Sequence, residues 1–176
     1  MIKKGYRNFI LILLAAIIII AAGYVIYKAY IKPIKPLPFK QVVTLYFYNP
    51  DTDTLKPEQR TVVPAAALLE KCRAIVAELE RGSGTGLTAP IPADVKVNNA
   101  TLQPNGILNL DLTKNLVMET PEGSSAEITA IYAIVNSIAR NIDQVKAVQL
   151  TIDGKRLETL KMHIEIDQPI VPDYTK

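Results

Sequence analysis

The sequence predicts an α/β domain of the α+β kind behind an N-terminal transmembrane helix. We expect a two-layer sandwich, in which two helices pack on one face of a small mixed sheet. Three observations support this. An uncharged apolar run occupies residues 9–27, extended runs rich in β-branched and aromatic residues recur after residue 40, and two amphipathic helical patterns interrupt them. The expected element order of the domain is ββαββαβ, with a further short strand at its end.

Residues 9–27, FILILLAAIIIIAAGYVIY, form the predicted membrane span. As a helix rising about 1.5 Å per residue, the run would cover roughly 28 Å, close to the hydrocarbon core of a bilayer. A cleaved signal peptide is the alternative, because the small residues 21–23 suit a peptidase, but the apolar run continues past them. The basic residues 1–8 favour a cytoplasmic N-terminus. We therefore expect a single-pass protein of the inner membrane, held by lipid around residues 9–27, with its domain outside the cytoplasm.

Residues 28–40, KAYIKPIKPLPFK, alternate lysine with proline. Such a segment favours an extended polyproline conformation of about 3 Å per residue, which predicts a stand-off spacer of roughly 40 Å. Pro33 and Pro36 form a P-x-x-P pattern, which can be a recognition motif. In a segment of this composition a spacer is the commoner role.

The net charge of +3 belongs to the membrane segment. Residues 1–40 hold 7 of the 20 basic residues and no acidic residue, so residues 41–176 carry 13 basic residues against 17 acidic ones. Anionic headgroups would attract the first part. The second part lacks the basic surface of a nucleic-acid binder, so we expect no nucleic-acid partner.

Two extended runs open the domain, at residues 42–48 and 58–63. Pro64 suits the first turn of a helix, where its missing N–H costs nothing. That helix is predicted over residues 65–81, with its apolar residues on one face. They are Leu68, Leu69, Cys72, Ile75, Val76 and Leu79. The glycine-rich residues 82–86, GSGTG, are predicted to form a flexible exit from it.

A hairpin of residues 95–102 and 107–112 is expected next, because the Gln-Pro-Asn-Gly sequence at 103–106 suits a tight turn with positive φ at its end. Pro90 and Pro92 precede this hairpin. They fix φ and lack donors, so we expect them to set the angle at which the chain enters it. This is a scaffold role, and a ligand loop is the alternative.

A second helix is predicted from Ser124 to about residue 141, because Ser124 and Glu127 match an S-x-x-E capping box. Its apolar face comprises Ile128, Ile131, Val135, Ile138 and Ile142. A strand over residues 145–152 follows, and residues 160–166 form the last expected extended piece.

At this point the residues resemble the GerMN domain family, first described in bacterial sporulation and germination proteins. The resemblance covers residues 41–167 and leaves residues 168–176 as a tail. The matching motifs are Gly86-Leu87 with Pro90-Ile91-Pro92, then LDLT at 110–113, VQLTIDG at 148–154 and HIEI at 163–166. The family motif positions, expected to be structural, are Gly86, Pro90, Pro92, Asp111, Asp153 and Gly154.

The resemblance implies a module similar to the ring-building modules of secretion-like complexes, usually membrane-tethered, non-enzymatic and extracytoplasmic. The sporulation protein that names the family carries two such domains behind a lipoprotein signal, whereas this chain has one domain behind an apolar helix. Its single cysteine, Cys72, is far from any lipidation position. An envelope role is therefore implied more safely than a spore role.

No cofactor, metal or catalytic constellation is expected. The sole histidine, His163, lies within the predicted last strand and is interpreted as structural. Cys72 is interpreted as a small core residue. Residues 51–53, Asp-Thr-Asp, lack the further ligands of a calcium loop and are interpreted as an exposed turn. Asp111 and Asp153 end strands, where turn hydrogen bonds explain them. The GSGTG sequence follows a helix and precedes no Gly-Lys-Ser/Thr, which disfavours a phosphate loop.

The function we expect is therefore a protein-interaction or scaffold domain of the envelope, which self-associates or binds an envelope protein. The alternative is a module for cell-wall glycan or another small ligand, with Tyr46, Tyr48 and the loop 82–86 at its rim. A hydrolase would need an active site that the sequence does not reveal.

Overall fold

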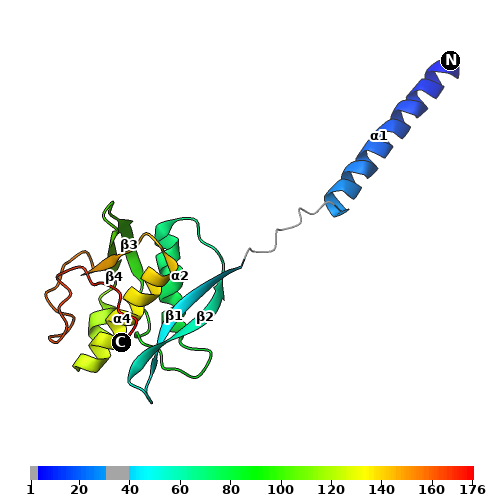
Figure 1. Cartoon of the computed structure of the whole chain (residues 1–176). Coiled ribbons are helices and arrows are strands. Elements are labelled where there is room, and N and C mark those ends of the chain that lie inside the picture. The colour runs from blue at the N-terminus through cyan, green and yellow to red at the C-terminus, as the bar shows by residue number, and fades with distance from the viewer. Residues whose placement is uncertain (1–3, 31–39) are drawn as a thin grey trace. The chain divides into compact units, whose positions relative to one another are not determined.

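The computed structural model describes residues 4–30 and 40–176 (Figure 1). Helix α1, Lys4–Tyr30, contains the predicted span, and its segment Asn8–Val25 has a mean hydropathy of 2.6. This helix is long and apolar enough to cross a membrane, as a signal sequence near an N-terminus also is. The helix continues into residues 28–30, which were assigned to the spacer, because no proline interrupts the chain before Pro33. The polyproline prediction for residues 31–39 lies outside the described residues.

The domain is mixed α+β, as predicted, but its strands form two sheets instead of one. β1, Gln41–Asn49, pairs antiparallel with β2, Thr54–Val62. β3, Val97–Leu102, pairs antiparallel with β4, Ile107–Leu112, and β4 pairs parallel with β5, Ala147–Ile152.

Helix side chains explain why β1 does not join the second sheet. α4, Ser124–Asn141, lies against β1, and the Asn141 side chain bonds both backbone groups of Thr44, at 2.9 and 2.7 Å. The hydroxyl of Ser137 accepts the N–H of Tyr46 at 2.9 Å. These contacts satisfy the strand edge that a neighbouring strand would otherwise occupy.

The helices α2, Leu68–Arg81, and α4 share the core with both sheets, and the short helix α3, Asn115–Glu119, precedes α4 (Figure 1). The alternate residues of β4, Leu108, Leu110 and Leu112, are fully buried in this core. The predicted core residue Cys72 is also fully buried, and burial raises the pKa of its thiol to about 11.

Three local predictions were wrong. α2 begins at Leu68 with Ala67 as its N-cap, so Pro64 lies before the helix. The N-cap of α4 is Gly123 and not Ser124. The predicted capping box is absent, because the Glu127 carboxylate forms hydrogen bonds with His163 instead of with the start of its own helix.

The third concerns residues 160–166, which form only an isolated bridge between Thr159 and Glu165. The free edge of β5 is paired elsewhere, since Val148 and Ile170 exchange backbone hydrogen bonds of 2.9 and 2.8 Å. The tail therefore packs on the domain. Its last residue, Lys176, accepts the N–H of Leu55 at 2.8 Å.

Candidate functional site

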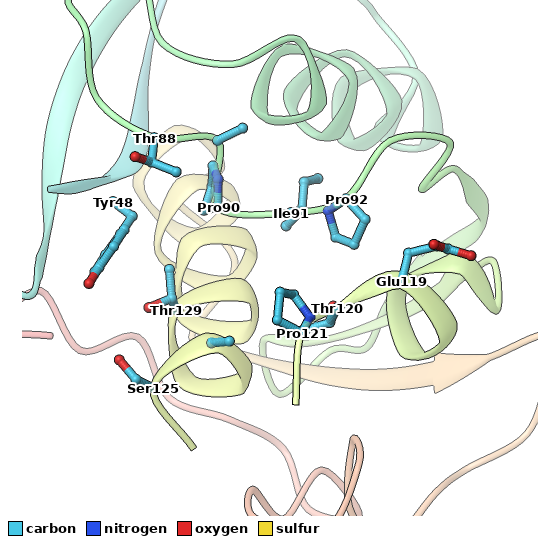
Figure 2. Close-up of a pocket in the computed structure, with 12 residues that line it drawn as sticks. Tyr48, Thr88, Pro90, Ile91, Pro92, Glu119, Thr120, Pro121, Ser125 and Thr129 are labelled. Carbon is cyan, nitrogen blue, oxygen red and sulfur yellow. The ribbon is translucent and has the colours of Figure 1, made fainter. Parts of the chain in front are cut away.

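A cleft of about 500 Å³ opens between the end of β1, the segment 88–92, the α3–α4 connection and the first turn of α4 (Figure 2). We call it the proline cleft. Its walls are formed by Tyr48, Thr88, Ala89, Pro90, Ile91, Pro92, Glu119, Thr120, Pro121, Ser125, Ala126 and Thr129. Carbon atoms of proline, alanine and isoleucine make up much of this surface. Its volume lies within the range of about 300–1,000 Å³ that is typical of ligand clefts.

The segment 88–92 forms one wall of the cleft, and backbone hydrogen bonds to β1 and the buried side chain of Ile91 fix its position. The N–H of Tyr48 donates to the carbonyl of Thr88 at 3.2 Å, and the N–H of Thr88 donates back at 2.8 Å. Ile91 is buried in the core, while Pro90 and Pro92 flank it along the cleft (Figure 2). Pro90 and Pro92 thus lie in the segment that connects the edge of β1 to β3. Both prolines also line the cleft.

The Tyr48 ring is fixed at one end of the proline cleft. Its hydroxyl donates to Oδ1 of Asp53 at 3.0 Å, and the hydroxyl of Ser125 donates to the same oxygen at 3.2 Å. The hydrogen bond to Asp53 raises the pKa of the phenol, so Tyr48 stays neutral at physiological pH. Asp53 lies in the predicted exposed turn between β1 and β2, with φ of 50°.

The first turn of α4 faces the cleft without a side-chain cap. The first intrahelical bond runs from the N–H of Glu127 to the carbonyl of Gly123, at 3.2 Å. The three preceding N–H groups therefore have no partner within the helix. An adjoining groove of about 330 Å³ continues from Ser125 and Thr129 toward Leu55 and Lys176.

The glycine-rich loop 82–86, predicted as the exit from α2, does not line the proline cleft, and hydrogen bonds connect it to β2. It encloses the buried carboxylate of Glu58, which accepts hydrogen bonds from the hydroxyl of Ser83 at 2.6 Å, the N–H of Gly84 at 3.0 Å and the hydroxyl of Thr85 at 2.8 Å. Arg60 pairs with the same carboxylate and donates to the carbonyl of residue 82 at 2.7 Å. Burial alone would raise the pKa of Glu58, but these hydrogen bonds outweigh it and lower the pKa to about 2.

The structure separates the family motif positions into two places. Pro90 and Pro92 line the cleft, and Gly86, with φ of 90°, lies in the loop before them. The other three surround the turn after β5, away from the cleft walls. There Oδ1 of Asp111 accepts the N–H of Gly154 at 2.7 Å, and Oδ1 of Asp153 accepts the Asn98 amide at 3.3 Å.

Sequence reasoning missed one contact, in which Nδ1 of the half-exposed His163 lies 2.7 Å from Oε1 of the buried Glu127 carboxylate. The Glu127 carboxylate also accepts the backbone N–H groups of Lys161 and His163, at 3.2 and 3.3 Å. Burial would raise the pKa of Glu127, but the hydrogen bonds hold it below its usual value. The spacing S-x-x-E pointed to a cap, and no other pattern marked this pair. Within residues 4–30 and 40–176, no three His, Cys, Asp or Glu side chains gather as metal ligands would.

The aromatic residues proposed for a glycan rim are separated. Tyr48 lines the cleft, whereas Tyr46 is buried with its ring 5.5 Å from that of Tyr174.

Comparison with known proteins identifies relatives of the domain. The Germane family model, described as sporulation and spore germination, matches residues 44–158. Among curated proteins, none matches the chain.

Solved structures share its fold. The tandem GerMN domains of the Bacillus subtilis sporulation protein GerM align with a TM-score of 0.60 and 17% identity, over 82% of this chain and 49% of that one. The first GerMN domain of the same protein aligns with a TM-score of 0.54 and 16% identity, over 77% and 98%. A candidate lipoprotein from Clostridium perfringens aligns with a TM-score of 0.52 and 18% identity, over 75% and 87%. The chain thus spans about half of the tandem structure and nearly all of the single domain.

Proposed function

The chain belongs to the Germane family of sporulation and spore germination, and we propose that it is a membrane-anchored, extracytoplasmic protein-interaction domain of the bacterial envelope. In a host that forms spores, it would serve a sporulation or germination complex. It would bind either another envelope protein or a second copy of itself, without catalysing a reaction.

The observation that carries this proposal is the proline cleft. Its largely apolar walls come from four separate segments, and core packing and backbone bonds hold the segment 88–92 against β1, so this side of the cleft exists before a partner arrives. Preorganised apolar clefts of this size suit protein segments, because binding then costs little ordering entropy. The apolar helix α1 supports membrane attachment.

The alternative function, binding of a cell-wall glycan, has one supporting feature. Tyr48 presents an aromatic ring to the cleft, on which a sugar could stack. The other two parts of the expected rim do not support it, because Tyr46 is buried and the loop 82–86 encloses Glu58.

The proposal is tested by in-membrane crosslinking of the tagged full-length chain, followed by capture and mass spectrometry. A photoreactive residue replaces Thr88, which is exposed at the cleft, and a matched control places it at Glu165, which is exposed and outside the cleft. Recovery of self-crosslinks or of one defined envelope protein from position 88 alone would support the proposal. Equal recovery from both positions, or recovery of nothing above background, would contradict it.

Protease treatment of spheroplasts tests the orientation. Digestion of the domain from outside is expected, and its protection until the membrane is permeabilised would contradict an extracytoplasmic location.

A further inference from the structure

We propose that the proline cleft binds a peptide segment in which an aromatic side chain is flanked by lysine or arginine. This inference rests on the proposed function and specifies the chemistry of the partner.

The apolar part of the cleft suits a flat side chain. Figure 2 shows Pro90, Ile91 and Pro92 along one side and Pro121 across from them, with the Tyr48 ring at the far end. Pro90 and Ile91 are themselves buried, so the accessible proline faces are those of Pro92 and Pro121. Proline rings present flat, rigid apolar faces, and they lose no rotamer freedom when a partner covers them. An aromatic ring between such faces buries a large apolar area, and aromatic residues are the usual anchors of protein interfaces.

The charges around the cleft favour a basic segment. Glu119 lines one end, and at the other end Asp53 holds Tyr48 and Ser125. Among the residues that the structure describes, no lysine or arginine lines the proline cleft. Lys176 lies in the adjoining groove and pairs with Asp173 at 3.8 Å, and the ammonium of Lys161 donates to the carbonyl of Met118, next to Glu119, at 3.5 Å. Carboxylates at both ends of an apolar cleft complement cations on both sides of an apolar anchor.

Hydrogen-bonding groups suit a peptide backbone. The N–H groups that have no partner within the first turn of α4, and the hydroxyl of Thr129, belong to residues at or next to the cleft wall, where they can meet peptide carbonyl groups. A glycan would need polar partners around most of its hydroxyl groups, whereas Pro92, Pro121 and the two alanines make up much of the accessible wall.

Fluorescence anisotropy with the full-length chain in nonionic detergent tests the inference. The probe is the labelled synthetic peptide KKPFPKK, compared with KKPAPKK, which lacks the ring, and EEPFPEE, which reverses the charges. We expect KKPFPKK to bind at least about tenfold more tightly than either comparison peptide, as for an interface anchor and its complementary charges. Its affinity should fall with salt, because the flanking charges are exposed.

Two variants locate the site. Ala126→Trp fills the cleft from the surface of α4 and should weaken binding of KKPFPKK about tenfold or more. Glu119→Lys should weaken it about fivefold at low salt, in proportion to one exposed charge pair. The matched control Glu165→Lys reverses an exposed charge elsewhere and should leave binding unchanged. Thermal melts confirm that each variant is folded.

Equal binding of KKPFPKK and KKPAPKK, or binding that survives Ala126→Trp, would overturn the inference. So would retention of the chain on isolated cell wall that Ala126→Trp abolishes, because the occupant would then be a glycan. If crosslinking from position 88 recovers a protein while KKPFPKK does not bind, the inference fails and the proposed function stands. If both experiments fail, the proposed function fails with it.

Discussion

Replacing Glu58 with glutamine tests whether the glycine-rich loop is built around a carboxylate. The side chain is 7% exposed and accepts hydrogen bonds from Arg60, Ser83, Gly84 and Thr85. Its pKa of about 2 in the folded domain compares with an ordinary value of 4.5. A difference of about 2.5 pKa units corresponds to about 3 kcal/mol of folding free energy, at 1.36 kcal/mol for each unit.

The sign of this contribution sets its pH dependence. Because the folded pKa is lowered, the stabilisation is fully present above pH 4.5 and is lost as the pH falls from 4.5 toward 2. At pH 7, Glu58→Gln should therefore lower the free energy of unfolding by about 3 kcal/mol, which is roughly 10 °C in melting temperature for a domain of this size. Near pH 2 the two proteins should differ little, because the carboxyl is then fully protonated in the unfolded chain and about half protonated in the folded domain.

Urea denaturation of residues 40–176, which contain the whole core, measures the difference at pH 7 and at low pH. The matched control Glu165→Gln removes an exposed carboxylate and should change stability by less than about 0.5 kcal/mol. A loss below about 1 kcal/mol at pH 7, or an equal loss at both pH values, would refute the hydrogen bonds between Glu58 and the loop 82–86 as a source of stability.

Three further substitutions test other contacts by the same denaturation assay. Gly106→Ala should destabilise the domain by about 1–3 kcal/mol, because residue 106 has φ of 88° and a Cβ there would lie 2.9 Å from the side chain of Lys146; a neutral result would contradict the turn geometry. Ser137→Ala should cost about 1–3 kcal/mol by leaving a buried backbone N–H of β1 unpaired, and a stable Ser137→Ala protein would argue that water replaces the hydroxyl. His163→Ala should lower the free energy of unfolding by a similar amount. It should also move the acid-induced loss of stability to higher pH, because the pKa of Glu127 is held low partly by the His163 side chain. An unchanged pH profile would mean that the two backbone N–H donors to Glu127 suffice to hold its pKa low.

Local patterns predicted most of the regular elements. The periodicity of α2 and α4 and the Pro-Asn-Gly turn depend on neighbours in sequence, and both helices and the turn are present with small shifts at their ends. The separation into two sheets depends instead on Asn141 and Ser137, which bond β1 across more than ninety residues. A pattern read along the chain carries no information about such a contact. The capping box fails for the same reason, since Glu127 has donors thirty-four and thirty-six residues away that satisfy it better than its own helix start does.

The sequence predicts the rigid segment with Pro90 and Pro92 but not the proline cleft, for a related reason. The sequence predicts that Pro90 and Pro92 fix the path of the chain before the hairpin. They also line a cleft because Thr88, just before them, pairs with Tyr48 of β1. The residues just before Thr88 are those of the glycine-rich loop, which Glu58 holds. The hydrogen bonds from the loop 82–86 to Glu58 therefore also restrain the chain that leads into the cleft wall, and a loop released from Glu58 would free that chain. Glu58→Gln should then weaken binding of KKPFPKK at pH 7 under conditions where the protein is still folded, although Glu58 does not line the cleft.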